Sequence, residues 1–99
     1  MVKGGAIYIM TNRTHTTLYV GVTSNLFSRV YQHKTNHYPK SFTAKYNCHK
    51  LVYFESFHSI EEAIARERQI KGGSKKKKLE LINSNNSDWK DLFEEIKEW

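Results

Sequence analysis

The sequence predicts an α+β fold in which a three-stranded antiparallel β-sheet is flanked by helices, in the order β-β-α-β-α-α-α. Two short β-type runs lie within the first 22 residues, and a third lies between two helical patterns. After the third run the chain carries only helical signals, which is typical of folds whose strands and helices are segregated. A chain of 99 residues with one proline and five glycines has room for one core, so we expect a single domain over residues 1–99.

The three strands are expected over residues 6–10, residues 17–22 and Lys50–Phe57. Residues 6–10 are apolar at every position, as in a strand that is buried on both faces. Residues 11–17 are polar, and residues 17–22 are rich in β-branched and aromatic side chains. The first two strands should therefore form an antiparallel hairpin.

The first helix is expected to begin at a Thr23 or Ser24 cap and to run to about Lys34. The spacing of its apolar residues predicts one buried stripe. That stripe consists of Leu26, Phe27, Val30 and Tyr31. Residues 36–47 hold the only proline of the chain, and we expect a loop there with one short element of undefined type.

Three further helices are expected in the second half of the chain. Ser59 and Glu62 form a capping box at the start of the first of them. This helix should run to about Lys71, because two glycines follow. Ser74 can cap the next helix, which should run to about Asn83. The last helix is predicted from apolar residues at i, i+3, i+4 and i+7. These residues are Trp89, Leu92, Phe93 and Ile96.

Charge is distributed unevenly along the chain, whose formal net charge is +6. The first 50 residues contain seven Lys or Arg side chains and no Asp or Glu, whereas all ten acids lie from Glu55 onward. A half-chain without carboxylates attracts polyanions, and nucleic acid is the commonest polyanionic partner. An anionic membrane surface, an acidic protein partner or an inert basic surface would give the same composition.

Cysteine content and hydropathy indicate the cellular setting. Cys48 is the only cysteine, so an intrachain disulfide and a cysteine-cluster metal site are both excluded. No apolar run approaches the roughly 20 residues that cross a bilayer, and no signal-peptide pattern opens the chain. We therefore expect a cytoplasmic protein that is not membrane-bound.

Arg29 and His33 are four residues apart on the first predicted helix, so their side chains share a face and can converge on one ligand. Arginine offers planar, permanently charged donors for phosphate oxygens, and histidine can transfer a proton near neutral pH. Tyr8 and Tyr19 bring one phenol to each of the first two strands. An Arg–His pair is also common on solvent-exposed helices, and both tyrosines could serve only as core packing. Taken together, the four residues indicate a site that cleaves phosphodiesters.

Glu67 interrupts an apolar stripe in the second predicted helix, where Ile60, Ala63 and Ile64 precede it at helical spacing. A carboxylate on a core-facing stripe must be paired, bind a cation or line the edge of a cleft. A buried salt bridge to an arginine agrees with the sequence as well as metal binding does. A single carboxylate can hold Mg²⁺ when water and substrate phosphate supply the other ligands.

Four consecutive lysines open the helix that follows the Ser74 cap, where cations oppose the helix dipole. Local stability does not favour this arrangement, so contact with a phosphate backbone is a functional explanation, and an inert exposed cluster is the alternative. The candidate nucleic-acid contacts are Lys75, Lys76, Lys77 and Lys78, together with Lys34 and Lys45 from the basic half.

These features together resemble the GIY-YIG nuclease superfamily, and in particular its small stand-alone bacterial proteins. The motif residues are Ile7-Tyr8, Tyr19-Val20-Gly21, Arg29, His33 and Glu67. The similarity extends over nearly the whole chain, including residues 42–46, 51–55 and 66–71. One departure is that the first motif reads Ala6-Ile7-Tyr8 rather than Gly-Ile-Tyr.

The resemblance implies an endonuclease that hydrolyses DNA phosphodiester bonds with one Mg²⁺ or Mn²⁺ ion, and DNA repair or recombination as its process. In this scheme Glu67 binds the metal, Arg29 neutralises charge on the pentacovalent phosphate, and Tyr19 activates the attacking water. Tyr8 and His33 orient or share the proton of that water. The partner implied by the resemblance is therefore DNA.

The resemblance also matches Asn86 to an asparagine that many members place near the site. Larger relatives carry extra DNA-reading domains for which this chain has no room, so site specificity should be weak, absent or supplied by a protein partner. We expect a monomer. Two other functions agree with the sequence. One is a nucleic-acid-binding module without turnover, and the other is a protein-interaction domain that exposes Trp89, Phe93 and Trp99.

Overall fold

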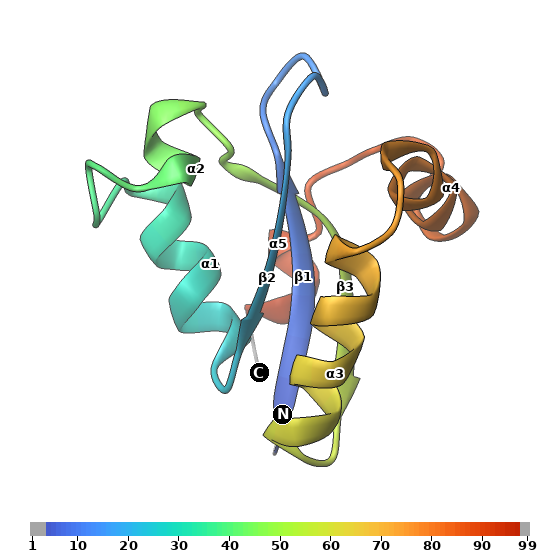
Figure 1. Cartoon of the computed structure of the whole chain (residues 1–99). Coiled ribbons are helices and arrows are strands. Elements are labelled where there is room, and N and C mark those ends of the chain that lie inside the picture. The colour runs from blue at the N-terminus through green and yellow to red at the C-terminus, as the bar shows by residue number, and fades with distance from the viewer. Residues whose placement is uncertain (1–3, 98–99) are drawn as a thin grey trace.

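The computed structural model describes residues 4–97 as a small sheet with helices on both faces (Figure 1). The strands are β1 (Gly5–Thr11), β2 (Leu18–Thr23) and β3 (Lys50–Phe57). The helices are α1 (Leu26–Lys34), α2 (Phe42–Lys45), α3 (Ile60–Lys71), α4 (Lys75–Asn85) and α5 (Phe93–Ile96). The predicted α+β class and three-stranded antiparallel sheet are confirmed, and the undefined short element of residues 36–47 is helix α2.

Strand β1 lies in the middle of the sheet, whose order is β2-β1-β3, and it pairs antiparallel with both neighbours. Every residue of β1 is buried, as its apolar run predicted. The register places Tyr8 opposite Gly21 and Met10 opposite Tyr19 on β2. Because side chains alternate along a strand, these four residues belong to the same face of the sheet.

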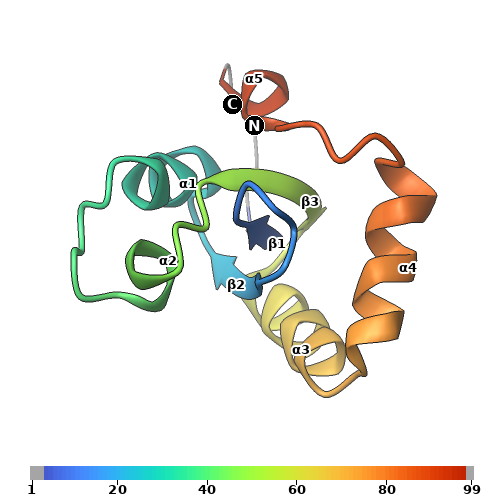
Figure 2. The same ribbon diagram turned by 90° about the horizontal axis from the view of Figure 1, so that it is seen from above.

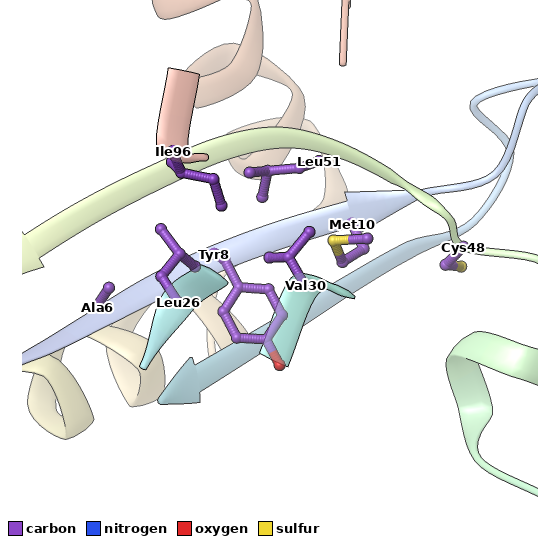
Figure 3. Packing of buried hydrophobic residues seen from close by; sticks show 8 residues of the cluster. All are labelled: Ala6, Tyr8, Met10, Leu26, Val30, Cys48, Leu51 and Ile96. Carbon is purple, nitrogen blue, oxygen red and sulfur yellow. The ribbon is translucent and has the colours of Figure 1, made fainter. Parts of the chain in front are cut away.

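One face of the sheet carries the core cluster of Figure 3, which α1 and α5 cover. We call it the first cluster. Its members are Ala6, Tyr8, Met10, Leu26, Val30, Cys48, Leu51 and Ile96. Cys48 lies at one end of the cluster with no exposed surface, and burial raises the pKa of its thiol.

The opposite face is covered by α3 and α4 (Figure 2). Its core, the second cluster, consists of Ile7, Ile9, Val20, Val52, Tyr53, Ala63, Ile70 and Ile82. The register of β3 with β1 shifts between Ile9 and Met10, so Leu51 and Tyr53, two residues apart on β3, lie on opposite faces of the sheet. Such a bulge interrupts the alternation of side chains. Leu51 consequently faces the first cluster, whereas Tyr53 faces the second.

Helices α1 to α4 each begin with a residue whose side chain caps the first turn. The cap of α1 is Asn25 rather than Thr23 or Ser24, and its side-chain oxygen accepts a hydrogen bond from the Ser28 amide at 3.1 Å. The other caps are Ser41 for α2, Ser59 for α3 and Ser74 for α4, the last two as predicted. No helix within residues 4–97 combines the length and the apolar character that a bilayer crossing needs.

The buried stripe of α1 differs from the predicted one. It consists of Leu26, Val30 and His33. Tyr31 is 53% exposed, so its assignment to the stripe was wrong. Its ring stacks on Phe27 along the side of the helix, with ring centroids 6.2 Å apart, while His33 takes the next inward position. A polar side chain on the buried stripe needs a partner inside the protein.

The prediction of one C-terminal helix over the Trp89, Leu92, Phe93 and Ile96 pattern was wrong. Trp89 has a φ of 52°, a left-handed conformation outside any α-helix, and α5 spans only Phe93–Ile96. Trp89 packs against the second cluster, while Leu92 and Phe93 pack against the first. The apolar spacing is helical, but here the chain passes from one face of the sheet to the other. Trp89 and Phe93 are partly buried, which argues against an exposed aromatic docking helix, and Trp99 lies outside the described residues.

Candidate active site

Tyr8 is placed by its close contact with Gly21. Tyr8 is only 1% exposed, and it lies beside Gly21, its cross-strand partner. A Cβ at residue 21 would lie 2.4 Å from both Cζ and Oη of Tyr8. Side-chain contacts are never that short, so the position of the ring requires glycine. This glycine is needed for close approach and not for backbone conformation, because no glycine within residues 4–97 has a positive φ.

His33 joins Tyr8 on β1 to helix α2 through two hydrogen bonds. Tyr8 Oη lies 2.9 Å from His33 Nε2, and His33 Nδ1 lies 2.7 Å from Thr43 Oγ1. The Thr43 hydroxyl is buried and also lies 3.2 Å from Oγ of Ser41, the cap of α2. The inward-facing histidine therefore has a partner on each ring nitrogen. A short polar chain runs from the sheet through α1 to α2.

Burial keeps both groups of the Tyr8–His33 pair in their neutral forms at pH 7. Burial is the main reason why the pKa of His33 is lowered to about 4, and the positive charge of Arg29 is the second. Burial is also the main reason why the pKa of Tyr8 is raised above its ordinary value; Tyr19 and, less strongly, Glu67 add to this effect, and Arg29 opposes it. A neutral imidazole has one donor and one acceptor nitrogen, so the pair can pass a proton in a defined direction.

Tyr19 lies beside this pair on the same face of the sheet. Its ring centroid is 6.2 Å from that of Tyr8 and 5.5 Å from that of His33. On its other side it lies 5.7 Å from the ring of Phe42 in α2. Tyr19 is half-buried, whereas Tyr8 is almost completely enclosed. Of the two phenols, Tyr19 is therefore the one that reaches solvent.

Arg29 and Glu67 belong to helices that cover opposite faces of the sheet. Arg29 is an exposed residue of α1, while Glu67 belongs to α3 on the other face and has a side chain that is 12% exposed. Both charges act on the Tyr8 hydroxyl, since Arg29 lowers its pKa and Glu67 raises it. Strand β2 is an edge strand, and α3 packs along it (Figure 2). Tyr8, Tyr19 and His33 are in direct contact, and the charges of Arg29 and Glu67 act on the Tyr8 hydroxyl from the neighbouring helices.

The family model of the GIY-YIG catalytic domain matches residues 4–80, which include all five of these residues. The chain belongs to the GIY-YIG family. It is similar to UPF0213 proteins of three bacteria. The one from Syntrophus aciditrophicus (strain SB) is 38% identical over 69 residues, which cover 70% of this chain and 79% of the relative. The one from Clostridium perfringens is 38% identical over 78 residues, covering 79% and 82%.

The third UPF0213 relative, from Pediococcus pentosaceus, is 31% identical over 85 residues, covering 86% of this chain and 87% of its own. The names of these relatives describe no activity. No solved structure matches the chain significantly. Membership of the GIY-YIG family places the protein in a nuclease superfamily whose members generally depend on a divalent metal ion.

Glu67 has the chemistry of a metal ligand in this GIY-YIG domain. Its carboxylate is a hard oxygen donor, and the ion pair that it forms is with Lys71 one turn later, at 2.8 Å from Nζ to Oε2, and not with an arginine. Within residues 4–97 no three His, Cys, Asp or Glu side chains gather into a metal cage. The residues therefore fit a site with one protein carboxylate that water and substrate phosphate complete, a common arrangement for Mg²⁺.

Lys34, a predicted nucleic-acid contact, is engaged within the GIY-YIG domain. Its Nζ donates a hydrogen bond to the main-chain oxygen of His49 at 2.9 Å and forms an ion pair with Asp91. The ammonium also lies 5.0 Å from the ring centroid of Phe93. These contacts join α1 to the segment before β3 and to the C-terminal segment. The structure does not bring Lys34 to the group of five.

Asn86 is also absent from the group of five, although the resemblance matched it to a residue near the site. Its side-chain amide is buried and donates hydrogen bonds to the main-chain oxygens of Val52, at 3.1 Å, and Lys90, at 2.9 Å. Val52 belongs to β3, the strand on the side of β1 away from β2. Asn86 therefore fixes the end of α4 to the opposite edge of the sheet.

The other predicted nucleic-acid contacts lie on two separate surfaces. Lys45 is exposed on α2, with its Nζ 5.4 Å from the ring centroid of Tyr46. At the start of α4, Lys75 donates a hydrogen bond to the main-chain oxygen of Thr16 at 3.0 Å. The rest of this lysine run comprises exposed Lys76 and Lys77 and half-buried Lys78.

Two contributors to the site received no role from the sequence. Lys71 follows Glu67 at i+4 on one helix, a spacing that commonly forms ion pairs, so this pair could have been predicted. Thr43 follows His33 by ten residues, and α1 ends between them. No local pattern relates these two positions, and only the way α2 folds back beside α1 brings them together.

Proposed function

We propose that this protein is a divalent-metal-dependent endonuclease that hydrolyses phosphodiester bonds in DNA, in repair or recombination. The observation that carries the proposal is the contact of Tyr8, Tyr19 and His33, with the charges of Arg29 and Glu67 acting on the Tyr8 hydroxyl. We assign all five side chains to one site. They combine a fixed cation, a carboxylate for a metal ion and hydroxyl and imidazole groups that can move a proton. Each of the three can accelerate hydrolysis of a phosphodiester.

Arg29 is proposed to bind the scissile phosphate. Arg29 is exposed on α1, its charge acts on both Tyr8 and His33, and its planar donors match phosphate oxygens. Negative charge grows on these oxygens as the attacking water bonds to phosphorus. A cation that is already in position stabilises this charge without reorganising, which is usually the largest contribution to such a rate enhancement.

The proton of the attacking water is proposed to move through the two tyrosines to the histidine. Tyr19 accepts the proton of the water as its own proton moves to Tyr8 Oη, and the proton of Tyr8 moves to His33 Nε2. The Nδ1 proton of His33 stays on its hydrogen bond to Thr43 Oγ1. Because Arg29 lowers the pKa of His33, a phosphate bound at Arg29 offsets that charge and makes the imidazole a stronger base.

Glu67 is proposed to hold the metal ion. A bound ion supplies Lewis-acid stabilisation of the phosphate and of the leaving oxygen. In the structure Lys71 occupies one oxygen of this carboxylate. The Lys71 side chain is 53% exposed, so its ammonium can return to solvent when a metal ion takes its place on the carboxylate.

Incubation of supercoiled plasmid and of branched DNA with Mg²⁺ or Mn²⁺ tests the proposal. We expect Arg29→Ala to lower the cleavage rate by about 10²–10³-fold, the loss that follows removal of a transition-state donor. Glu67→Gln should abolish cleavage, and added metal should not restore it. Arg68→Ala is the matched control, because Arg68 is an exposed arginine next to Glu67 on α3, and it should cleave at the wild-type rate.

Two results would contradict the nuclease proposal. One is the absence of cleavage by the folded wild-type protein with either metal, and the other is equal cleavage by wild type and Glu67→Gln. Binding of DNA with a steep salt dependence, unaffected by Mg²⁺, would then support the alternative of a nucleic-acid-binding module without turnover.

A further inference from the structure

In the part of the chain that the structure describes, the exposed aromatic residues of Tyr and Phe type lie in one segment, residues 31–46. Within residues 4–97, the exposed large hydrophobic side chains are Tyr31, Tyr38, Phe42 and Tyr46. Phe42 and Tyr46 are one turn apart at the two ends of α2, and their ring centroids are 4.7 Å apart. They are 45% and 41% exposed. Each residue thus leaves more than two fifths of its surface in solvent, and two such rings side by side form an exposed apolar patch that can contact a ligand.

Phe42 and Tyr46 continue a row of rings that begins in the candidate site. The centroid distances along this row are 6.2 Å from Tyr8 to Tyr19, 5.7 Å from Tyr19 to Phe42 and 4.7 Å from Phe42 to Tyr46. Exposure rises along the row, from the enclosed Tyr8 through the half-buried Tyr19 to the two rings on α2. The row therefore joins the Tyr8 hydroxyl to an open aromatic surface.

The surroundings of these rings are basic. Lys45 lies between them in sequence, with its Nζ 5.4 Å from the ring centroid of Tyr46, and the exposed Arg29 belongs to the adjacent α1. Residues 1–50, which contain the whole row, include no Asp or Glu. Aromatic rings beside cations are the usual surface for single-stranded nucleic acid, since bases stack on the rings and phosphates meet the cations.

We propose that α2 is a base-stacking platform, on which Phe42 and Tyr46 hold unpaired nucleobases of a DNA strand whose phosphate lies at Arg29. Bases within a duplex stack on each other and offer no free face, so the platform selects single strands or unpaired segments. The choice of scissile phosphate rests on the proposed nuclease function, whereas binding of bases to α2 requires no catalysis.

The platform is tested by fluorescence anisotropy in EDTA, where no strand is cut. The probes are a labelled DNA strand of about 12 nucleotides, within the range that such surfaces cover, its blunt duplex, and an abasic strand of equal charge. Wild type should bind the strand with bases more tightly than either other probe. Tyr46→Ala should weaken that binding by roughly 5–150-fold, the loss typical of one stacked base, and should leave binding of the abasic strand unchanged.

Tyr46→Trp and Tyr31→Ala are the matched variants. A tryptophan keeps a stacking face, so Tyr46→Trp should retain the affinity of wild type. Tyr31 is more exposed than Tyr46 but stacks on Phe27, which is not part of the row, so Tyr31→Ala should leave the binding of every probe unchanged. Phe42 is kept, because its ring contacts Tyr19. An RNA strand of the same sequence is the last probe, and binding equal to or weaker than that of DNA supports the proposal.

Equal affinity for the abasic and the natural strand would overturn the platform. An unchanged affinity of Tyr46→Ala, with a wild-type circular dichroism spectrum, would overturn it as well, and binding of RNA alone would overturn the assignment to DNA. These failures are distinguishable from failure of the nuclease proposal. If the protein cleaves plasmid but binds the natural and the abasic strand equally, only the platform proposal fails. If it binds the natural strand more tightly but does not cleave plasmid, only the nuclease proposal fails.

Discussion

At the scale of single residues, Gly21 on β2 leaves the space that the Tyr8 ring of the candidate site occupies. An alanine there places Cβ 2.4 Å from Tyr8 Oη, so the ring must move away from His33. We expect Gly21→Ala to lower the free energy of unfolding in urea by about 1–3 kcal/mol through overpacking and to impair cleavage. Gly73→Ala is the control, since its Cβ would meet its nearest atom at 3.4 Å. Wild-type stability of Gly21→Ala would contradict this account.

His33 should make the stability of the protein depend on pH below neutrality. Its pKa is about 4 in the folded protein and 6.5 in the unfolded chain, so the unfolded state binds more protons between these values. The free energy of unfolding therefore falls as the pH falls from 6.5 towards 4, by on the order of 3 kcal/mol when the shift is fully expressed. The charged or titratable groups that act on His33 are Arg29 and His49, while Tyr8 beside it stays neutral.

Urea unfolding of wild type and His33→Gln, at pH 7 and near pH 4, measures this effect. The glutamine variant keeps a polar side chain but cannot take up the proton, so its stability should fall less on acidification. His58→Gln changes an exposed histidine and should behave as wild type does. If His33→Gln and wild type lose the same free energy of unfolding, the neutral state of His33 does not contribute to the pH dependence.

Sequence alone could single out Glu67, because a carboxylate on an apolar stripe needs an explanation, whereas Tyr8 could equally have been core packing until the structure showed its hydrogen bond to His33. The contacts of residues whose partners are remote could not be predicted. The engagement of Lys34 by Asp91, 57 residues away, leaves no local signal. The same is true of Asn86, whose amide bonds to β3.

At the scale of elements, Asp91 ties the C-terminal segment to two other parts of the fold. Its Oδ1 accepts a hydrogen bond from the Leu51 amide of β3 at 3.2 Å, and its Oδ2 pairs with Lys34 of α1. Asp91→Ala leaves both donors without this partner, and we expect thermal unfolding to show a loss of about 1–3 kcal/mol. Glu94→Ala removes an exposed pair with Lys97 instead and should change stability by less than about 1 kcal/mol. Equal losses would contradict the role of Asp91.

The strands and the longer helices were predictable because their signals are local. The apolar run of β1 and the serine caps of α3 and α4 act within a few residues. The C-terminal pattern is different. Its apolar residues have helical spacing, but they pack on two faces of the sheet and only Phe93–Ile96 is helical. Periodicity reports that residues are buried and does not report against what.

At the scale of the whole molecule, the charge of +6 and the acid-free first half predict DNA binding that weakens steeply with salt. Lys76 is exposed at the start of α4. If it contacts one phosphate, Lys76→Met should reduce the slope of log K against log salt for duplex DNA by about 0.9. Lys34→Met should leave the slope unchanged, because Asp91 already neutralises Lys34. An equal decrease for both variants would show that Lys34 reaches the DNA.

Cys48 carries the only thiol of the chain and is buried in the first cluster, whose members include Met10 of β1 and Leu51 of β3. Alkylating reagents attack the thiolate, and Cys48 has neither solvent access nor a lowered pKa. Modification must therefore wait until this corner opens. The rate at which a reagent labels Cys48 under native conditions therefore reports local opening of the first cluster, which includes Tyr8. No engineered probe is needed.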